Sequence, residues 1–157
     1  MAESWTSRLL RWRMNWFPAY RGTGARITYV AADGLEARIR LPLSWRSRNY
    51  VGTIFGGSMY GAVDPIYMVM LIRALGPEFV VWDKAATIRF LRPGRSTLYA
   101  TFRLEAKMIE AIASEARTVG ALTREFSVEL LDADGQACFS CVKTIYVRCR
   151  TNPPGTP

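Results

Sequence analysis

The sequence predicts an α+β domain in which an antiparallel sheet of about six strands curls around one long helix. The first observation behind this is a long apolar segment, Met59 to Leu75, which follows the pair Gly56-Gly57. The second is a series of shorter segments in which apolar and polar residues alternate, the pattern of a sheet with one buried and one solvated face. Packing the apolar face of the sheet against the apolar helix buries both.

The chain is expected to open with an amphipathic helix over residues 4–17. The apolar residues of this segment recur at spacings of three and four, with arginines elsewhere around the helix: Trp5, Leu9, Trp12 and Trp16. Pro18 ends the helix, because the residue before a proline avoids the helical conformation. We favour an apolar face that packs as a lid on the body of the same protein; the alternative is a helix that lies on a membrane surface.

Turn signals divide the remainder into elements. Asp33-Gly34 is typical of a hairpin turn, and it separates strands expected at Arg26–Ala32 and Leu35–Leu41. The long helix begins at Gly56 and ends near Gly76, a residue suited to a helix end. Four further strands are expected, at Phe79–Leu91, Thr97–Glu105, Thr118–Leu131 and Gln136–Arg148. The segment Lys107–Glu115 stays ambiguous, because its helical spacing occurs in a stretch that also suits a strand.

These elements form a single domain over residues 1–150, with a core at 25–148 and a flexible tail at 151–157 that is rich in Pro and Gly. A chain of 157 residues that is 50% hydrophobic can bury a core without disulfides or metals. Cys138, Cys141 and Cys149 are too few for a disulfide framework, and we expect inert structural thiols in a cytoplasmic protein. We expect neither a secretion signal nor membrane insertion, since an acid interrupts the long apolar segment.

The chain contains no histidine, which excludes Ser-His-Asp and Cys-His nucleophile systems and most imidazole zinc sites. Catalysis would have to use carboxylates, backbone dipoles, hydroxyls or lysine, and no metal or organic cofactor is implied. The net charge of +8 suits a polyanionic partner or simply a basic soluble surface. We expect no nucleic acid, because the sequence carries no nucleic-acid motif.

One motif concentrates the chemistry: Asn49-x-x-Gly52-Thr53-x-Phe55-Gly56-Gly57, followed seven residues later by Asp64. A buried acid in an apolar helix is costly unless it has a function or a partner. Asp64 can act as a general base or nucleophile with a pKa raised by burial, and Pro65 beside it is expected to kink the helix. The backbone N–H of Gly56 at the helix start can receive an oxyanion. The alternative is a structural Asp64 that accepts backbone hydrogen bonds.

The motif resembles that of the phenylacetate-pathway acyl-CoA thioesterases, Asn-x-x-Gly-x-x-His-Gly-Gly with an Asp seven residues on. Ile88 to Pro93 is similar to the strand of that family that ends in Phe-Leu-Arg-Pro. The chain is similar still more closely to an uncharacterised branch that has Trp-Asp-Lys-Ala-Ala, here Trp82 to Ala86, and Phe at the motif His position, here Phe55. The resemblance implies a hotdog fold, a homodimer or tetramer, and hydrolysis of an acyl-CoA or acyl-carrier thioester by Asp64 and Gly56. The competing class is a non-catalytic acyl-thioester-binding protein; a dehydratase and a basic nucleic-acid binder rank below both.

Further residues complete the predicted site. Asn49 bonds the substrate carbonyl or holds its own loop, and Phe55 and Gly57 flank the glycine amide. Tyr67 stands one turn after Asp64, where relatives often have Ser or Thr. Lys84 is expected to pair with Asp64 or to meet a CoA phosphate. The other candidates for the CoA phosphates, or else for plain solvated charges, are Arg89, Arg92 and Arg95.

Geometry adds one expectation about assembly. Gly56 and Asp64 are eight residues apart, so they lie about 12 Å from each other along a helix axis. One helix therefore cannot bring both to a single carbonyl group. Two antiparallel helices in a dimer can, with Gly56 from one subunit and Asp64 from the other.

Overall fold

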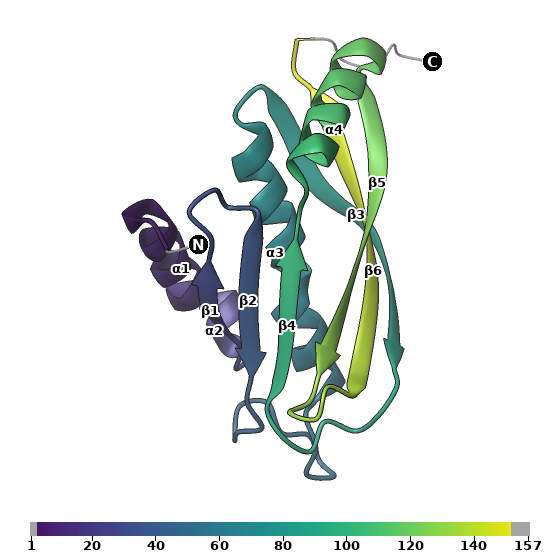
Figure 1. Cartoon of the computed structure of the whole chain (residues 1–157). Coiled ribbons are helices and arrows are strands. Elements are labelled where there is room, and N and C mark those ends of the chain that lie inside the picture. Colours follow the sequence, from purple (N-terminus) through teal and green to yellow (C-terminus); the bar gives the residue numbers. More distant parts are fainter. Residues whose placement is uncertain (1–2, 152–157) are drawn as a thin grey trace.

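The structure is a computed structural model that describes residues 3–151. One antiparallel sheet of six strands, in the order β1-β2-β4-β5-β6-β3, curves around the helix α3 (Figure 1). The strands are β1 (Arg26–Val30), β2 (Glu36–Leu41), β3 (Phe79–Phe90), β4 (Leu98–Arg103), β5 (Ala121–Leu131) and β6 (Ala137–Cys149). The helices are α1 (Trp5–Trp16), α2 (Pro18–Gly22), α3 (Gly56–Leu75) and α4 (Ala106–Val119). The predicted α+β class, with its central helix and additional N-terminal helix, is confirmed.

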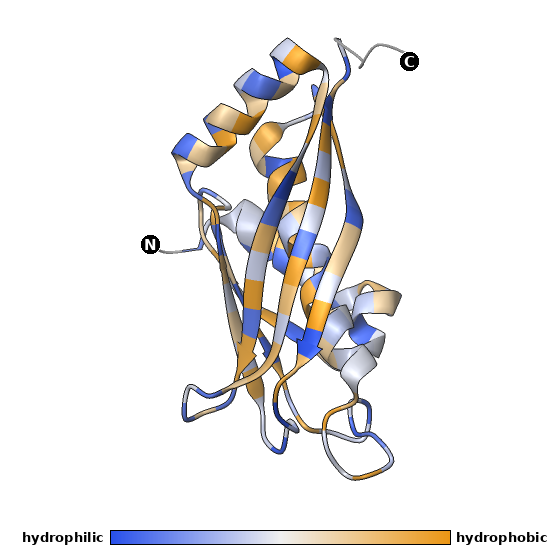
Figure 2. Cartoon of the chain, turned by 90° about the vertical axis from the view of Figure 1, so that its right-hand side faces the viewer, coloured by the Kyte–Doolittle hydropathy of each residue, from blue (hydrophilic) through white to orange (hydrophobic). Residues whose placement is uncertain are grey.

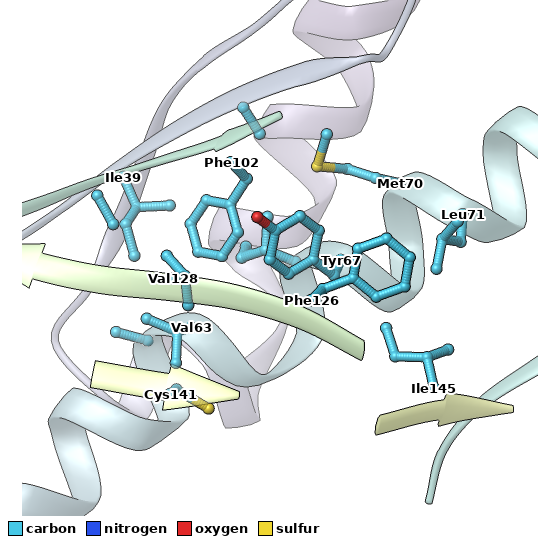
Figure 3. Close-up of a cluster of buried hydrophobic side chains, with 14 of the residues drawn as sticks. Ile39, Val63, Tyr67, Met70, Leu71, Phe102, Phe126, Val128, Cys141 and Ile145 are labelled. Carbon is cyan, nitrogen blue, oxygen red and sulfur yellow. The ribbon is translucent and has the colours of Figure 1, made fainter. Parts of the chain in front are cut away.

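The core lies between α3 and the concave face of the sheet. Val63, Tyr67 and Met70 project from α3 toward Phe102 on β4 and Phe126 on β5 (Figure 3). Along the strands, hydrophobic and hydrophilic residues follow one another in bands (Figure 2), and β2 alternates buried with exposed positions as the sequence predicts. Two positive-φ glycines support the predicted hairpin turns, Gly34 at φ 75° and Gly135 at φ 77°.

The ambiguous segment after β4 is helical. α4 buries Ile112 and Ala116, and it lies across the end of the sheet next to β5 (Figure 1). The strand predicted to begin at Thr118 begins instead at Ala121, because the helix runs on to Val119 and stops at Gly120, whose φ is 84°. The short helix α2 was not predicted; Pro18, which ends α1, also starts α2 at a position where its missing N–H costs nothing.

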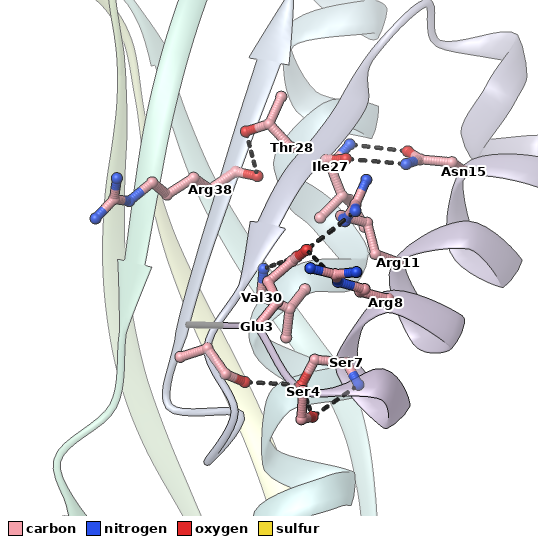
Figure 4. Close-up of polar contacts among 11 residues, drawn as sticks. Glu3, Ser4, Ser7, Arg8, Arg11, Asn15, Ile27, Thr28, Val30 and Arg38 are labelled. Atoms are coloured by element: carbon pink, nitrogen blue, oxygen red, sulfur yellow. Dashed lines mark hydrogen bonds and ion pairs between the residues drawn. The ribbon is translucent and has the colours of Figure 1, made fainter. Parts of the chain in front are cut away.

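The N-terminal helix packs with the face opposite to the predicted one. Asn15 donates to the Ile27 carbonyl (2.9 Å) and accepts from the Ile27 N–H (2.8 Å), and the Ser7 hydroxyl donates to the Ala31 carbonyl (2.9 Å; Figure 4). Glu3 accepts from the Val30 N–H at 2.9 Å. β1 is an edge strand, so these polar groups satisfy backbone atoms that no neighbouring strand pairs. The tryptophans are left outside, and the expectation that they pack on the body is wrong.

The sheet is weakly joined between β4 and β5. The two strands pair at one position among the described residues, Tyr99 with Leu131. In the gap, the Tyr67 hydroxyl donates to the Ser127 carbonyl of β5 at 3.0 Å and accepts from the backbone of Arg103 on β4. A side chain of the central helix therefore replaces part of the missing strand pairing.

The cysteines are free and buried; Cys138 and Cys141 lie on β6 as predicted, and Cys149 is its last residue. Burial raises the pKa of the Cys138 and Cys141 thiols, which keeps them protonated and unreactive. Within residues 3–151, no helix combines the length and the apolar character needed to cross a bilayer. Most of the predicted tail, residues 152–157, lies outside the described residues.

Candidate active site

Asp64 lies midway along α3, and its carboxylate reaches Lys143 of β6. The Asp64 side chain is 41% exposed, so the expectation of deep burial is wrong. It lines a pocket of about 660 Å³ between α3 and the two N-terminal helices. The pocket is mostly apolar, and its walls include Leu10, Met14, Phe17, Met68 and Val69. An acid at the edge of an apolar pocket is the arrangement expected where a ligand has both an apolar part and a reacting polar group.

A buried lysine holds Asp64. Lys143 of β6 is 1% exposed, and its ammonium group forms ion pairs with Asp64 and, at 3.1 Å, with Asp83 of β3. Burial alone would lower the pKa of Lys143, but its hydrogen bonds to the two carboxylates raise that pKa overall. The lysine therefore stays charged and fixes the position of both acids.

Sequence reasoning missed Lys143 and assigned its role to Lys84. Lys84 is exposed, and its ammonium lies 5.9 Å from the centre of the Tyr146 ring, so its predicted pairing with Asp64 is wrong. Successive strand residues face opposite sides, which turns Lys84 outward and Asp83 inward. The available signal was parity, because Lys143 shares the inward face of β6 with Cys141 and Ile145.

Asp83 and Tyr60 complete this cluster. Burial, more than any other influence, raises the pKa of Asp83, and its Oδ1 is buried with no hydrogen-bond partner among the described residues. Tyr60 precedes Asp64 by one turn, and burial together with a hydrogen bond to Asp64 raises the pKa of its hydroxyl. The Lys143 ammonium lies 5.4 Å from the Tyr60 ring centre. The cluster thus offers a carboxylate, a phenol and an unsatisfied acceptor beside one fixed positive charge.

The start of α3 forms a separate site. Gly56 is its first residue, and Phe55 before it makes no side-chain capping bond. No described residue accepts a hydrogen bond from the Gly56 N–H. Gly56, Asn49, Phe90 and Arg92 line a pocket of about 460 Å³. An uncapped helix start with a free N–H is suited to bind negative charge.

Glycine at position 56 allows a close approach of the Phe90 ring. A Cβ there would lie 2.7 Å from the Phe90 ring, which is closer than carbon atoms approach. At Gly57 a Cβ would overlap the Phe55 ring, which is 55% exposed. Two aromatic rings therefore cover the first turn of α3, and each depends on a missing side chain beneath it.

Asn49 holds its own loop. Its side-chain oxygen accepts from the N–H groups of Val51 (3.1 Å) and Thr53 (2.9 Å), and its amide nitrogen donates to the Thr53 hydroxyl (2.8 Å). Gly52 completes the turn with φ 84°, a conformation that favours glycine. Of the two roles predicted for Asn49, the geometry supports the loop role, since its side-chain oxygen and nitrogen are both engaged.

Tyr67 belongs to the core rather than to the site. It packs against Phe102 and Phe126, with ring centres 5.0 Å and 5.1 Å away, and its hydroxyl is used between β4 and β5. Placing it beside Asp64 was wrong, because the Tyr67 hydroxyl bonds the backbone of β5 and β4, whereas Asp64 bonds Lys143 and borders the pocket.

The three predicted phosphate-binding arginines, Arg89, Arg92 and Arg95, are exposed. Arg92 alone among them lines the Gly56 pocket, and its guanidinium donates to the Gln136 side chain at 2.7 Å. Of the predicted arginines, Arg92 is thus the one placed near the helix start.

Within one chain, the two halves of the predicted site stay apart. The pocket lined by Asp64 and the pocket lined by Gly56 share no residue. A third hollow of about 700 Å³ lies over β4, β5 and β6 and contains none of the predicted site residues. Over the described part of the chain, no group of His, Cys, Asp or Glu is arranged to hold a metal ion.

Comparison with solved structures identifies the fold. A Pseudomonas aeruginosa protein, PA5026, described as of unknown function and a probable thioesterase, superimposes with a TM-score of 0.83 at 20% identity, over 91% of this chain and 95% of that one. A Chlorobaculum tepidum protein of unknown function gives 0.74 at 12% identity, over 92% and 95%. Thioesterase HI1161 from Haemophilus influenzae gives 0.67 at 15%, over 94% and 93%. The architecture is the hotdog fold, as the resemblance implied.

The sequence also matches a family model over residues 6–147, a span that includes nearly all of α1, the loop before α3 and the sheet except the last two residues of β6. The chain belongs to the DUF4442 family, whose description is a domain of unknown function. No curated protein matches the sequence.

Proposed function

We propose that this protein hydrolyses an acyl thioester, an acyl-CoA or acyl-carrier conjugate, with Asp64 as its general base or nucleophile. The observation that carries the proposal is a lysine-held carboxylate at the edge of an apolar pocket of about 660 Å³ on the central helix of a hotdog fold. The thioesterase names of structural neighbours support the same reaction class. Fold similarity alone does not assign an activity, so the proposal depends mainly on the chemistry of the site residues.

The reaction needs a nucleophile and a group that receives the oxyanion. Asp64 takes a proton from a water molecule whose oxygen bonds to the thioester carbon, or its own carboxylate attacks and water then opens the resulting anhydride. The carbonyl oxygen gains negative charge, which the free Gly56 N–H at the start of α3 stabilises. When water attacks, the C–S bond then breaks and the departing thiolate takes up the proton that Asp64 holds. When the carboxylate attacks, the C–S bond breaks as the anhydride forms, and the thiolate takes up a proton from the water that opens the anhydride.

Both groups meet only if two chains share each site, so we propose a dimer or a tetramer built from dimers. β3 supports this, because it is a long strand at the edge of the sheet that exposes Trp82, Ile88 and Phe90. An unpaired apolar edge strand is a natural surface for association. In such an assembly, we propose that Arg92, which lines the Gly56 pocket, binds a nucleotide phosphate of the substrate. Buried free thiols suit a reducing compartment, and we propose the cytoplasm.

Substituting Asp64 with asparagine tests the proposal. The change keeps the size of the side chain and removes the proton acceptor, while Lys143 keeps its ion pair with Asp83. On a panel of acyl-CoAs of graded length, we expect hydrolysis to fall below about one hundredth of wild type with acyl-CoA binding retained. Turnover above that level would show that Asp64 is not the catalyst.

Two observations favour a second function, the binding of an acyl thioester without turnover. Asp64 is already engaged by Lys143, and Phe55 stands where the related thioesterases have histidine. The same panel separates the two functions. A binding protein would bind acyl-CoA in calorimetry, and neither the wild type nor Asp64→Asn would release free thiol.

A further inference from the structure

The outer face of α1 is aromatic, exposed and unused by the fold. Trp5, Trp12 and Trp16 are 79%, 59% and 56% exposed, and Leu9 between them is 47% exposed. The helix is fixed to the body by other side chains: Ser7 on the opposite face bonds the Ala31 carbonyl, and Asn15 at the edge of the aromatic face makes two hydrogen bonds to Ile27 of β1. Stability of the domain therefore does not explain the tryptophans, since three such side chains on one face are expensive to leave in water.

Basic side chains surround these rings. The three tryptophans, with Arg8, Arg11, Arg26 and Asn15, line a surface groove of about 620 Å³. The helix itself carries no acid, and Arg21 lies over the Trp16 ring at 4.7 Å. Glu3 is the acid near this face; it accepts two hydrogen bonds from Arg11 (2.9 Å and 3.0 Å) and one from the Val30 N–H, and it lies 3.9 Å from Arg8. One acid thus faces three arginines, and the groove combines aromatic surface with a net positive charge.

We propose that α1 docks the protein on the surface of an anionic phospholipid bilayer. Tryptophan prefers the boundary between headgroups and acyl chains, and arginine binds lipid phosphates with two hydrogen bonds. A helix of 12 residues is too short to cross the bilayer and would lie in the plane of the interface. The net charge of +8 attracts the same surface over a longer range.

Charge also decides against a second copy of the chain as the occupant. In a two-fold contact through this groove, Arg8 and Arg26 of one copy would face the arginines of the other. Like charges brought together in this way oppose association. A lipid phosphate layer presents the opposite charge to every one of them.

The inner face of the same helix lines the Asp64 pocket, which connects the proposed docking to the proposed function. Leu10, Arg13 and Met14 line the pocket that Asp64 borders, so α1 separates that pocket from the proposed membrane surface. If the proposed thioester hydrolysis is right, docking brings the pocket to the place where long acyl chains partition. The docking itself does not depend on turnover, and its test uses none.

The test is sedimentation of the purified protein with vesicles of phosphatidylcholine alone or with about one third phosphatidylglycerol. We expect binding to the anionic vesicles, weakened by salt, and little to the neutral ones. Replacing Trp5, Trp12 and Trp16 together with alanine should weaken binding at least roughly tenfold, and Arg8→Gln roughly fivefold. All four side chains are largely exposed, so the variants should fold as wild type does.

Trp45→Ala is the matched control, because Trp45 is 82% exposed but lies in the loop before α3, and its loss should leave vesicle binding unchanged. Quenching of tryptophan fluorescence by brominated lipid should vanish in the triple variant. The proposal is overturned if wild type ignores anionic vesicles or if the triple variant binds them equally. It is also overturned if the triple variant instead changes the oligomeric state in analytical ultracentrifugation, which would make this face a contact between copies.

Discussion

Lys143 is the residue on which the candidate site depends most. Its charge is buried, and it is tolerated because Asp64 and Asp83 both face it. Removing the lysine would leave two carboxylates side by side, with one oxygen of Asp83 already lacking a partner. In the sequence, this lysine is a charged residue at a strand position where the alternation of apolar and polar residues predicts an apolar one. It is therefore easily overlooked as a member of a site.

Lys143→Met should destabilise the fold by roughly 2–3 kcal/mol, less than the 3–5 kcal/mol of a fully buried pair because Asp64 is 41% exposed. Because the folded pKa of Lys143 lies above its unfolded value, its ion pair contributes fully at neutral pH. That contribution is lost as pH rises through the folded pKa, so the gap between the variants should close at alkaline pH. Urea unfolding of both proteins across this range measures it.

Lys84→Met is the control, since Lys84 is exposed and has no carboxylate partner in the described structure. It should change the free energy of unfolding by less than about 0.5 kcal/mol. If the two substitutions cost the same, the buried lysine does not hold the acids together.

At the scale of elements, the alternating strands and the long helix were predictable to within a few residues. The local sequence is sufficient for this, because a strand alternates apolar and polar residues with a period of two and the long helix is a continuous apolar segment. The packing face of α1 was not predictable in that way. The apolar period of α1 predicted that the tryptophans would face the body. In the structure, Ser7 and Asn15 face it instead, because they bond backbone groups at the unpaired edge of the sheet. Such a choice depends on a strand placed at the edge by the whole sheet, which a local pattern does not contain.

The gap between β4 and β5 gives a second prediction. Tyr67→Phe removes the hydroxyl that joins the Ser127 carbonyl to the backbone of Arg103, and leaves the ring packing intact. We expect a loss of about 1 kcal/mol in the free energy of unfolding, because a part-buried carbonyl loses its partner. Faster amide hydrogen exchange in β5 should accompany it. Tyr99→Phe, an exposed change on β4, is the control and should have no effect on either measurement.

At the scale of the whole molecule, the sequence located both halves of the site but not their supporting residues. Gly56 and Asp64 were found because a motif of fixed spacing carries them. Lys143 lies 79 residues from Asp64, Asp83 lies on β3, the next element after α3, and the curvature of the sheet brings both to Asp64. Such contacts have no fixed spacing in the sequence that could be recognised as a motif. For this reason the sequence predicts Lys84, and not Lys143, as the partner of Asp64.

The separation of the two pockets makes shared sites testable by complementation. Gly56→Pro removes the free N–H at a helix position that tolerates proline, and Asp64→Ala removes the acid. Each protein should be inactive alone. Unfolded together and reassembled, they should regain about a quarter of wild-type hydrolysis, because half of the dimers are mixed and each mixed dimer has one intact site.

Gly56→Ala is the control that separates the effect of losing the backbone N–H from the effect of adding a side chain at position 56. Its Cβ meets the same Phe90 ring, 2.7 Å away in the present structure, but the N–H is retained. Phe90 is 58% exposed and can turn aside, so Gly56→Ala should keep most of its activity, while Gly56→Pro should lose it. If reassembled mixtures stay inactive although mixed dimers are seen by mass spectrometry, Asp64 must work with donors of its own chain. The exposed edge of β3 would then need another explanation than a shared active site.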